Sequence, residues 1–308
     1  MAAPLTLADL GEDAVVKRLT SLLPESRGDV LLGPGDDCAL VEVSGAEHHV
    51  LLKADSVVEG VHFTSEERME RVGWKALCRA ISDIAAMGGW PAHALITLAA
   101  SPSTSIERLD ALYKGLAKAA TAYGVSVVGG ETGKTTGPLV CTVFLTGYVE
   151  PRVCVRRSGG SPGDVLLVTG KLGGSLASGH HLDFEPQLEA GRWLAKNGFP
   201  SAMMDLSDGL AADALRLARA SGCGLALDVK ALPCRPGCGV AAALHDGEDF
   251  ELLLAVAPER VGELLERWQS AFPNLALTSV GCLQDKAAGV YPAEIFQEGG
   301  KSGYDHFQ

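Results

Sequence analysis

Acidic residues recur in short, glycine-containing turns along this chain of 308 residues. Asp36 and Asp37 are adjacent, Asp205 and Asp208 share one turn, and Asp83 falls on an otherwise apolar helical face. The carboxylates of these segments are Asp36, Asp37, Asp55, Asp83, Glu131, Asp205, Asp208, Glu248 and Asp249. One aspartate in a turn usually caps a helix or bonds its own backbone. Several anionic oxygens gathered at one site instead need cations, and Mg²⁺ is the expected ion.

Glycine-rich turns follow two of the apolar segments. One, at 129–130, comes after 125–128, and another, at 170–174, comes after 165–169 and opens a helical segment. Such turns expose backbone N–H groups that can bind anions. Glycine-rich turns beside carboxylates that hold Mg²⁺ predict nucleotide chemistry, because phosphoryl transfer needs positioning and charge neutralisation more than a protein nucleophile.

Other catalytic and metal-binding motifs are incomplete in this chain. Gly133-Lys134-Thr135 resembles the end of a P-loop, but Val128 stands where the first glycine is needed. The GxSxG at 159–163 precedes a strand instead of leading from a strand into a helix. The CxxxC formed by residues 234–238 has no second pair to complete a zinc site. The motifs therefore leave metal-assisted chemistry on phosphates as the main indication.

The composition excludes several classes of protein. An apolar fraction of 47% and a charged fraction of 21% are typical of a folded globular chain. A balance of 26 basic against 38 acidic residues, a net charge of -12, disfavours a nucleic-acid partner. The longest uncharged run, from Ile84 to Ile106, is interrupted by glycines and prolines, so we expect no membrane span. With no evident signal peptide and with eight scattered cysteines, we expect a cytoplasmic protein.

Hydrophobic periodicity predicts the elements that position these side chains. Strands are predicted at 28–32, 38–43, 48–54, 93–100, 125–128, 139–149, 165–169, 203–206, 224–228, 250–256 and 275–281. Helices are predicted at 66–87, 105–122 with Ser105 as its N-cap, 173–180, 186–197, 209–220 and 258–270. We expect the strands at 125–128 and 139–149 to be buried, and His180 and His181 to lie in a solvated loop. A boundary near residue 150 divides the chain into two α/β domains, 1–150 and 151–308.

Sequence motifs spread over nearly the whole chain point to a known family. They are GDDCA at 35–39, DSVVEGVHF at 55–63, SDIAAMG at 82–88, GGET at 129–132, RSGGSPGD at 157–164, DLSDGL at 205–210, GEDFEL at 247–252 and GYDHF at 303–307. In this order they resemble the thiamine-monophosphate kinases, of the superfamily that includes aminoimidazole ribonucleotide synthetase. VEGVHF and GYDHF are the most specific parts, and they favour this family over relatives such as selenophosphate synthetase.

The resemblance implies an activity and a site. It implies transfer of a phosphoryl group from ATP to thiamine phosphate by direct in-line attack with several Mg²⁺ ions. It also implies a homodimer with an N-terminal mixed sheet at the interface and a C-terminal α/β domain that closes over the nucleotide. The implied metal ligands are Asp36, Asp37, Asp55, Asp83, Glu131, Asp205 and Asp208. The implied contacts to ATP are Tyr123, Gly130, Arg157 and Ser207, and those to thiamine phosphate are His62, Glu248 and Tyr304.

The chemistry of these side chains is consistent with the implied roles. The acidic Glu248 suits the cationic part of thiamine, and Tyr304 offers an aromatic face to the ring cation. Structural roles are the alternatives for three of the residues: packing for Tyr304, a satisfied half-buried histidine for His62 and a surface charge for Arg157.

Three departures from the family pattern leave alternatives open. Lys53 and Ala54 replace hydroxyl residues before Asp55, Glu131 replaces an aspartate, and Gln187 replaces an arginine. Strand alternation puts Lys53 and Asp55 on one face, so we hypothesise that the Lys53 ammonium takes over part of one metal's role. The alternative for Lys53 is that it extends to solvent. The alternatives for the whole chain are a related ATP-dependent enzyme with another small substrate, or a catalytically silent protein that binds nucleotide or thiamine phosphate.

Overall fold

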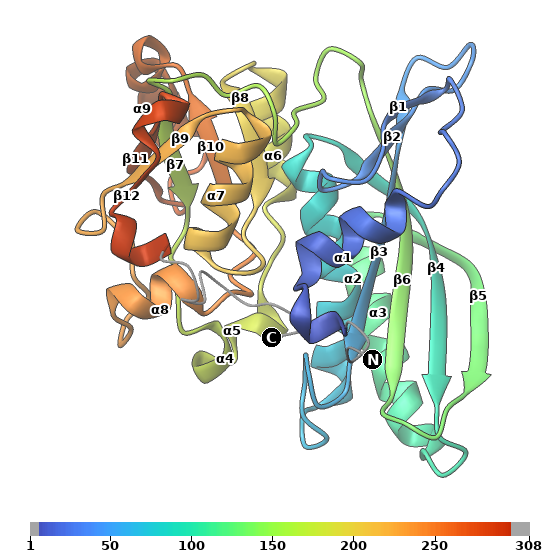
Figure 1. Cartoon of the computed structure of the whole chain (residues 1–308). Coiled ribbons are helices and arrows are strands. Elements are labelled where there is room, and N and C mark those ends of the chain that lie inside the picture. Colours follow the sequence, from blue (N-terminus) through green and yellow to red (C-terminus); the bar gives the residue numbers. More distant parts are fainter. Residues whose placement is uncertain (1–5, 297–308) are drawn as a thin grey trace, which may run out of the picture.

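Two mixed β-sheets form the framework of the chain (Figure 1). The computed structural model describes residues 6–296. The first sheet, in the order β1-β2-β3-β6-β4-β5, contains β1 Val30–Leu32, β2 Ala39–Val41, β3 His49–Val58, β4 Trp90–Ala100, β5 Ser126–Lys134 and β6 Val140–Val149. The second sheet, in the order β12-β9-β11-β7-β10-β8, contains β7 Val165–Thr169, β8 Pro200–Asp205, β9 Gly224–Leu227, β10 Leu252–Val256, β11 Leu277–Gln284 and β12 Val290–Tyr291. The predicted mixed α/β fold is confirmed.

Helices lie between the two sheets and around the second one (Figure 1). The helices of the first part are α1 Glu12–Thr20, α2 Met69–Ala86 and α3 Ile106–Tyr123. Those of the second part are α4 Ser175–Ser178, α5 His180–Asp183, α6 Leu188–Lys196, α7 Leu210–Ala220, α8 Val240–His245 and α9 Pro258–Ala271. Three short 3₁₀ helices are η1 Leu7–Asp9, η2 Lys286–Ala288 and η3 Ala293–Phe296.

The long periodic segments fold as predicted, whereas the short ones differ. The Ser105 hydroxyl accepts a hydrogen bond from the Arg108 N–H at 3.3 Å, which confirms the predicted N-cap of α3. The helix predicted at 173–180 is two single turns, α4 and α5, because Gly179 between them adopts a φ of 73°. The sequence analysis did not predict α1 or α8.

Helix α2 is the central element of the molecule, and 14 of its 18 residues are buried. It packs against α3 and the first sheet on one side, and against α5, α6 and β8 of the second part on the other. Gly73 of α2 and Gly115 of α3 allow a close approach, since a Cβ at Gly115 would lie 1.9 Å from the Glu70 carbonyl oxygen. Polar side chains of α2 are thereby carried into the space between the two sheets.

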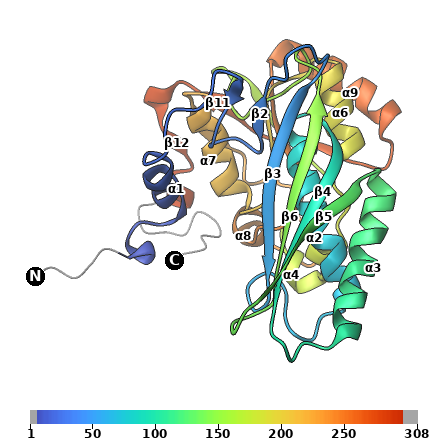
Figure 2. The same cartoon turned by 90° about the vertical axis from the view of Figure 1, so that its right-hand side faces the viewer.

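The outer face of the first sheet carries no helix from residues 6–296 (Figure 2). The prediction that strand 125–128 is buried holds for Val125 alone, because every residue of β5 is exposed. In β6 the odd-numbered residues from Cys141 to Val149 are buried, as predicted, and the even-numbered ones point outward. The apolar residues Val127 and Val128 have the composition of a buried strand, yet in this chain both are exposed.

All eight cysteines are free thiols. In the part of the chain that the structure describes, no helix has the length and apolar character needed to cross a lipid bilayer.

Candidate active site

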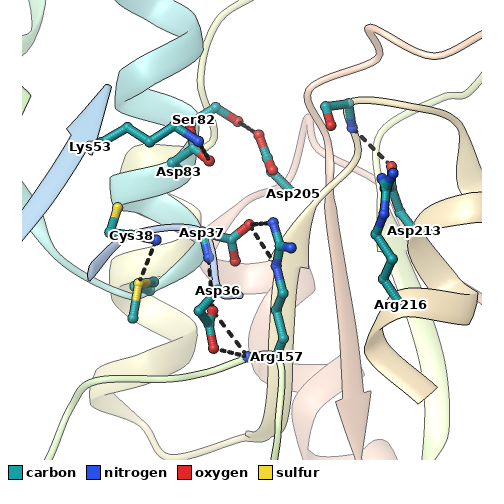
Figure 3. Close-up of polar contacts among 12 residues, drawn as sticks. Asp36, Asp37, Cys38, Lys53, Ser82, Asp83, Arg157, Asp205, Asp213 and Arg216 are labelled. Carbon is teal, nitrogen blue, oxygen red and sulfur yellow. Dashed lines mark hydrogen bonds and ion pairs between the residues drawn. The ribbon is translucent and has the colours of Figure 1, made fainter. Parts of the chain in front are cut away.

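Three buried carboxylates meet between the two sheets (Figure 3). Asp37 precedes β2, Asp83 belongs to α2 and Asp205 ends β8, and their oxygens lie within 4.8 Å of one another. Oδ2 of Asp37 is buried and has no hydrogen-bond partner among the described residues. Because like charges at this separation repel and an unpaired buried oxygen is costly, the trio fits a hard divalent cation such as Mg²⁺.

Hydrogen bonds from both parts of the chain hold the trio in place. The Ser82 hydroxyl donates to Oδ2 of Asp205 at 2.6 Å, which links α2 to the end of β8. Asp36 accepts hydrogen bonds from the Asp37 N–H at 2.9 Å and from the Arg157 N–H at 3.1 Å. Burial and the charge of Asp37 raise the pKa of Asp36 to about 6, and the same two causes raise that of Asp205 to about 6. Asp36 thus supports the turn that presents Asp37.

Arg157 places its guanidinium directly on the trio. Its Nη2 lies 2.5 Å from Oδ1 of Asp37, and its Nε donates to the same oxygen at 3.1 Å. The alternative reading of Arg157 as a surface charge is therefore wrong, because its side chain is only 20% exposed.

Lys53 also points into the cluster (Figure 3). Its Nζ donates to Oδ1 of Asp83 at 2.5 Å. In β3, Leu51 and Val57 are buried whereas Leu52 and Ala54 are exposed, so the predicted alternation holds and Lys53 shares its face with Asp55. Although burial opposes it, the charges of Asp83 and Asp55 raise the pKa of Lys53, which remains a cation. The alternative that Lys53 extends to solvent is therefore wrong.

Asp55 lies outside the trio and is paired with Arg79 of α2. Nε of Arg79 donates to Oδ2 of Asp55 at 3.2 Å, and its Nη2 lies 3.1 Å from Oδ1. Burial opposes ionisation, but Arg79 and Lys53 hold the pKa of Asp55 below its ordinary value. Both oxygens of this implied metal ligand therefore already contact a guanidinium.

The loop that follows Asp205 is held by two residues that the sequence analysis did not identify. Oδ2 of Asp213 accepts the N–H groups of Ser207 and Asp208, each at 3.0 Å. Arg216 binds the carboxylates of both Asp208 and Asp213. Asp208 therefore sits in an ion pair beside the trio instead of within it. Asp213 stands on the buried face of α7, and a carboxylate on an apolar helix face was the signal that could have identified it.

These side chains line one cleft of about 720 Å³ between the two sheets. Its wall contains seven of the residues implied by the resemblance: Asp36, Asp55, Asp83, Arg157, Asp205, Ser207 and Asp208. Helix α1 closes one side of the cleft through Asp13 and Lys17.

A smaller hollow beside the cleft contains His62 and Glu248. The Glu248 carboxylate contacts three cationic or basic groups: Nζ of Lys75 at 2.7 Å, Nδ1 of His181 at 3.2 Å and Nη1 of Arg79 at 3.5 Å. Burial acts to raise the pKa of Glu248, but His181 and Lys75 lower it to about 2. The expectation that His181 is a solvated loop residue is wrong. Glu248 therefore already has cationic partners within the chain.

Lys75, Arg79 and Asp83 recur every four residues along α2, so they share one helix face. This face connects the hollow, the Asp55 carboxylate and the trio in that order. The spacing is visible in the sequence, and it was the signal that could have identified Lys75 and Arg79.

Three implied nucleotide or metal contacts lie away from the cleft. Gly130 on β5 and Asp55 on β3 are three strands apart in the sheet, joined by the cross-strand partners Ile96 and Val143. Three strand spacings put Gly130 about 14 Å from Asp55. Glu131 pairs with Thr97, on the opposite face from the buried Ile96 and Leu98, and therefore lies on the outer face of the sheet. Tyr123 packs against Trp74, with ring centres 5.9 Å apart, and lines a different hollow.

Two further sequence predictions concern the glycine-rich turn at 170–174 and Tyr304. The N–H groups of Gly173 and Gly174 donate to the Asp249 and Asp246 carboxylates, so the predicted phosphate cradle at 170–174 is bound by the chain's own side chains. Tyr304 lies outside the described residues.

Comparison with known proteins identifies the class. Residues 35–149 match the family described as "AIR synthase related protein, N-terminal domain". The structure named "AaThiL complexed with AMPPCP and TMP" is similar with a TM-score of 0.84 at 30% identity, over 99% of this chain and 100% of that chain. The fold and the carboxylate-lined cleft thus define an α/β protein with two mixed sheets, whose first part matches the AIR synthase-related class.

Curated relatives identify the family within this class. Thiamine-monophosphate kinase of Rhodopirellula baltica is 36% identical over 80% of this chain and 81% of its own length. The protein of the same name from Salmonella typhimurium is 31% identical over 96% of this chain and 98% of its own length. The chain belongs to the thiamine-monophosphate kinase family, which confirms the resemblance carried by its motifs.

Proposed function

We propose that the protein transfers the γ-phosphoryl group of ATP to thiamine monophosphate and releases thiamine diphosphate and ADP. The observation that carries this proposal is the buried trio of Asp37, Asp83 and Asp205. Asp83 and Asp205 line the cleft between the two sheets, and Asp37 has an unpartnered oxygen. A solved family member described as a complex with AMPPCP and TMP supports the assignment of the two ligands.

The chain's own residues neutralise and orient charge in this reaction. Asp37, Asp83 and Asp205 would hold Mg²⁺, which neutralises the charge of the polyphosphate when bound. Arg157 and Lys53 add fixed positive charges next to the same carboxylates. An oxygen of the acceptor phosphate attacks the γ-phosphorus in line, and the bond from that phosphorus to the β–γ bridging oxygen breaks. No covalent intermediate with the protein is required.

The two parts of the chain divide this work. Residues 1–150 supply Asp37, Lys53 and Asp83, and residues 151–308 supply Arg157 and Asp205. We propose that the second part closes over the nucleotide, because its contribution to the trio reaches the cleft from the opposite side.

We also propose that the protein is a homodimer joined through the outer face of the first sheet. Exposed apolar residues lie there on three neighbouring strands: Leu52 on β3, Leu95 on β4, and Phe144 and Tyr148 on β6. An exposed strand edge next to an apolar surface is usually covered. Gly130 and Glu131 would lie at or near this interface, so contacts from them to nucleotide would require the second copy.

The decisive experiment incubates purified protein with ATP, MgCl₂ and thiamine monophosphate and separates the products by chromatography. We expect thiamine diphosphate and ADP in equal amounts, and neither product with Asp37→Asn. ADP formed only with a different small acceptor would support another enzyme of the superfamily. Nucleotide binding without any product would support the silent binding protein. The observation that motivates this alternative is the ion pair between Lys53 and Asp83, a member of the trio.

A further inference from the structure

The cleft and the smaller hollow meet at a shared wall. Four residues line both cavities: Arg79, Ser207, Asp208 and Phe250. Of these four described residues, Arg79 alone is a cation. If the nucleotide occupies the cleft and the acceptor occupies the hollow, the transferred group passes this wall.

The guanidinium of Arg79 is fixed at the wall by contacts on several sides. It forks onto both oxygens of Asp55, and its Nη1 lies 3.5 Å from Oε1 of Glu248, at the outer limit of a hydrogen bond. The guanidinium carbon lies 5.9 Å from the centre of the Phe250 ring. Its side chain is only 11% exposed.

The loop opposite Arg79 is docked in a strained conformation. Glu248 and Phe250 have positive φ angles of 54° and 51°, which non-glycine residues rarely adopt. Their N–H groups donate to the carbonyl oxygens of Ser207, at 2.7 Å, and Leu206, at 2.8 Å. The loop is therefore held against the segment after β8, and it keeps Glu248 and Phe250 facing Arg79.

Lys75, one turn earlier on the same helix face, provides a contrast. Its Nζ donates to the His62 carbonyl oxygen at 2.6 Å and to Oε2 of Glu248 at 2.7 Å, and it lies 2.9 Å from Nδ1 of His181. The Lys75 side chain is fully buried. The contacts of Arg79 use Nε, Nη1 and Nη2 once each, whereas a guanidinium carries five N–H donors. Arg79 thus retains donors for a ligand at the wall of the cavities, whereas the buried Lys75 side chain offers none to them.

Phosphoryl transfer to a phosphate brings two anions together, and this repulsion costs about 3 kcal/mol for each pair of unit charges 5 Å apart at an effective dielectric of 20. A planar guanidinium binds phosphate oxygens in a fork and offsets this cost. We propose that Arg79 binds the phosphate of the acceptor and aligns it with the γ-phosphate. This inference rests on the proposed function and names the residue that holds the attacking group.

The test compares Arg79→Met and Arg79→Lys with the wild type. We expect Arg79→Met to weaken binding of thiamine monophosphate by about 10- to 100-fold while the Kd for ATP changes by less than about 3-fold. Arg79→Lys should lose less, because it keeps the charge without the fork. Inhibition by thiamine, which lacks the phosphate, should keep its wild-type strength in both variants.

Arg71→Met is the matched control, since Arg71 of α2 makes a comparable ion pair with Asp183 away from both cavities. Its melting temperature should fall, with no selective loss of affinity for thiamine monophosphate. The role of Arg79 would be overturned if Arg79→Met lost as much affinity for ATP as for thiamine monophosphate. It would also be overturned if inhibition by thiamine weakened as much as the binding of thiamine monophosphate. If the wild type is active and the Arg79 variants bind thiamine monophosphate as tightly as it does, this inference alone is overturned. If the wild type shows no turnover, the proposed function is overturned.

Discussion

Nζ of Lys53 lies 2.5 Å from Oδ1 of Asp83, so one member of the carboxylate trio is paired with a cation of the chain itself. The two residues come from β3 and α2, and both side chains are largely buried. A lysine ammonium next to a metal-ligating carboxylate supplies a fixed charge that needs no ion from solution. We therefore hypothesise that this chain needs less metal charge in the cleft than a chain with a hydroxyl residue at the same position.

Exchanging Lys53 should change how the protein uses Mg²⁺. Lys53→Thr replaces the ammonium by an oxygen that can ligate metal, so we expect a steeper, higher-order dependence of the rate on Mg²⁺. Lys53→Met removes the charge and offers no oxygen, so we expect the Kd for ATP to rise by about 3- to 10-fold without an additional metal. Metal stoichiometry by equilibrium dialysis and ATP binding by calorimetry report both effects independently of turnover.

Lys17→Met is the control for this series, because Lys17 is an exposed lysine of α1 at the same cleft. It should match the wild type in both measurements. If Lys53→Thr and Lys53→Met also match the wild type, Lys53 takes no part in the function.

Removing divalent cations should abolish activity and lower stability. The three carboxylates repel one another, and Oδ2 of Asp37 lacks a partner within the described chain. We therefore expect no turnover in excess EDTA, and a melting temperature that rises on addition of Mg²⁺. At a concentration 100 times its Kd, a bound ion stabilises the fold by about 2.7 kcal/mol.

Asp37→Asn separates this effect from a general effect of salt on the fold. We expect the variant to keep a normal melting temperature in EDTA and to lose the rise caused by Mg²⁺. Full turnover in excess EDTA, or an equal Mg²⁺-dependent rise in the variant, would contradict a metal site at the trio.

Local patterns were sufficient to predict several parts of this site. Strand alternation correctly placed Lys53 and Asp55 on one face of β3, because a two-residue period is a property of the strand alone. The prediction that the carboxylates gather also held for Asp37, Asp83 and Asp205, because their segments meet between the two sheets.

The pairing of these charges could not be predicted in the same way. Whether Asp55 faces a metal or Arg79, and whether Asp208 faces the trio or Arg216, depends on how α2 and α7 pack between the sheets. His181 was misjudged for the same reason, since its contact with Glu248 joins residues far apart in the chain. The exposure of β5 was also missed, because apolar residues for a buried face and for an interface look alike in sequence.

Charging the outer face of the first sheet should give a monomer. Phe144 is exposed and pairs across strands with the exposed Leu95. A lysine at position 144 would bury an unpaired charge in the proposed interface, so we expect Phe144→Lys to weaken dimerisation by at least about 100-fold. Light scattering at micromolar concentration should give about twice the mass of one chain for the wild type and one chain for the variant.

Leu265→Lys is the control, because Leu265 is a similarly exposed apolar residue on α9, away from the sheet face. It should retain the wild-type mass. A wild type that is already monomeric would contradict the dimer, and a dimeric Phe144→Lys would place the interface elsewhere.

Glu251→Gln should remove part of the pH dependence of stability. The Glu251 carboxylate is buried in the second part, where it accepts hydrogen bonds from the Thr169 hydroxyl at 2.6 Å and the Gln187 amide at 2.9 Å. Burial raises its pKa from 4.5 to about 7, with Asp249 adding to the shift. Between these two pH values the folded protein binds a proton that the unfolded chain does not, so the contribution of Glu251 to the free energy of unfolding falls as pH rises.

A glutamine keeps an oxygen for Thr169 and Gln187 but does not ionise. The free energy of unfolding measured by urea denaturation at pH 5 and pH 8 should therefore decline less in Glu251→Gln than in the wild type, by up to about 3 kcal/mol. Glu266→Gln, at an exposed glutamate of α9, controls for the loss of one negative charge and should follow the wild-type decline. Parallel curves for the wild type and Glu251→Gln would mean that the Glu251 carboxylate ionises as easily in the folded protein as in the unfolded chain. A steeper decline in the variant would mean that the ionised form of Glu251 makes the stronger hydrogen bonds with Thr169 and Gln187.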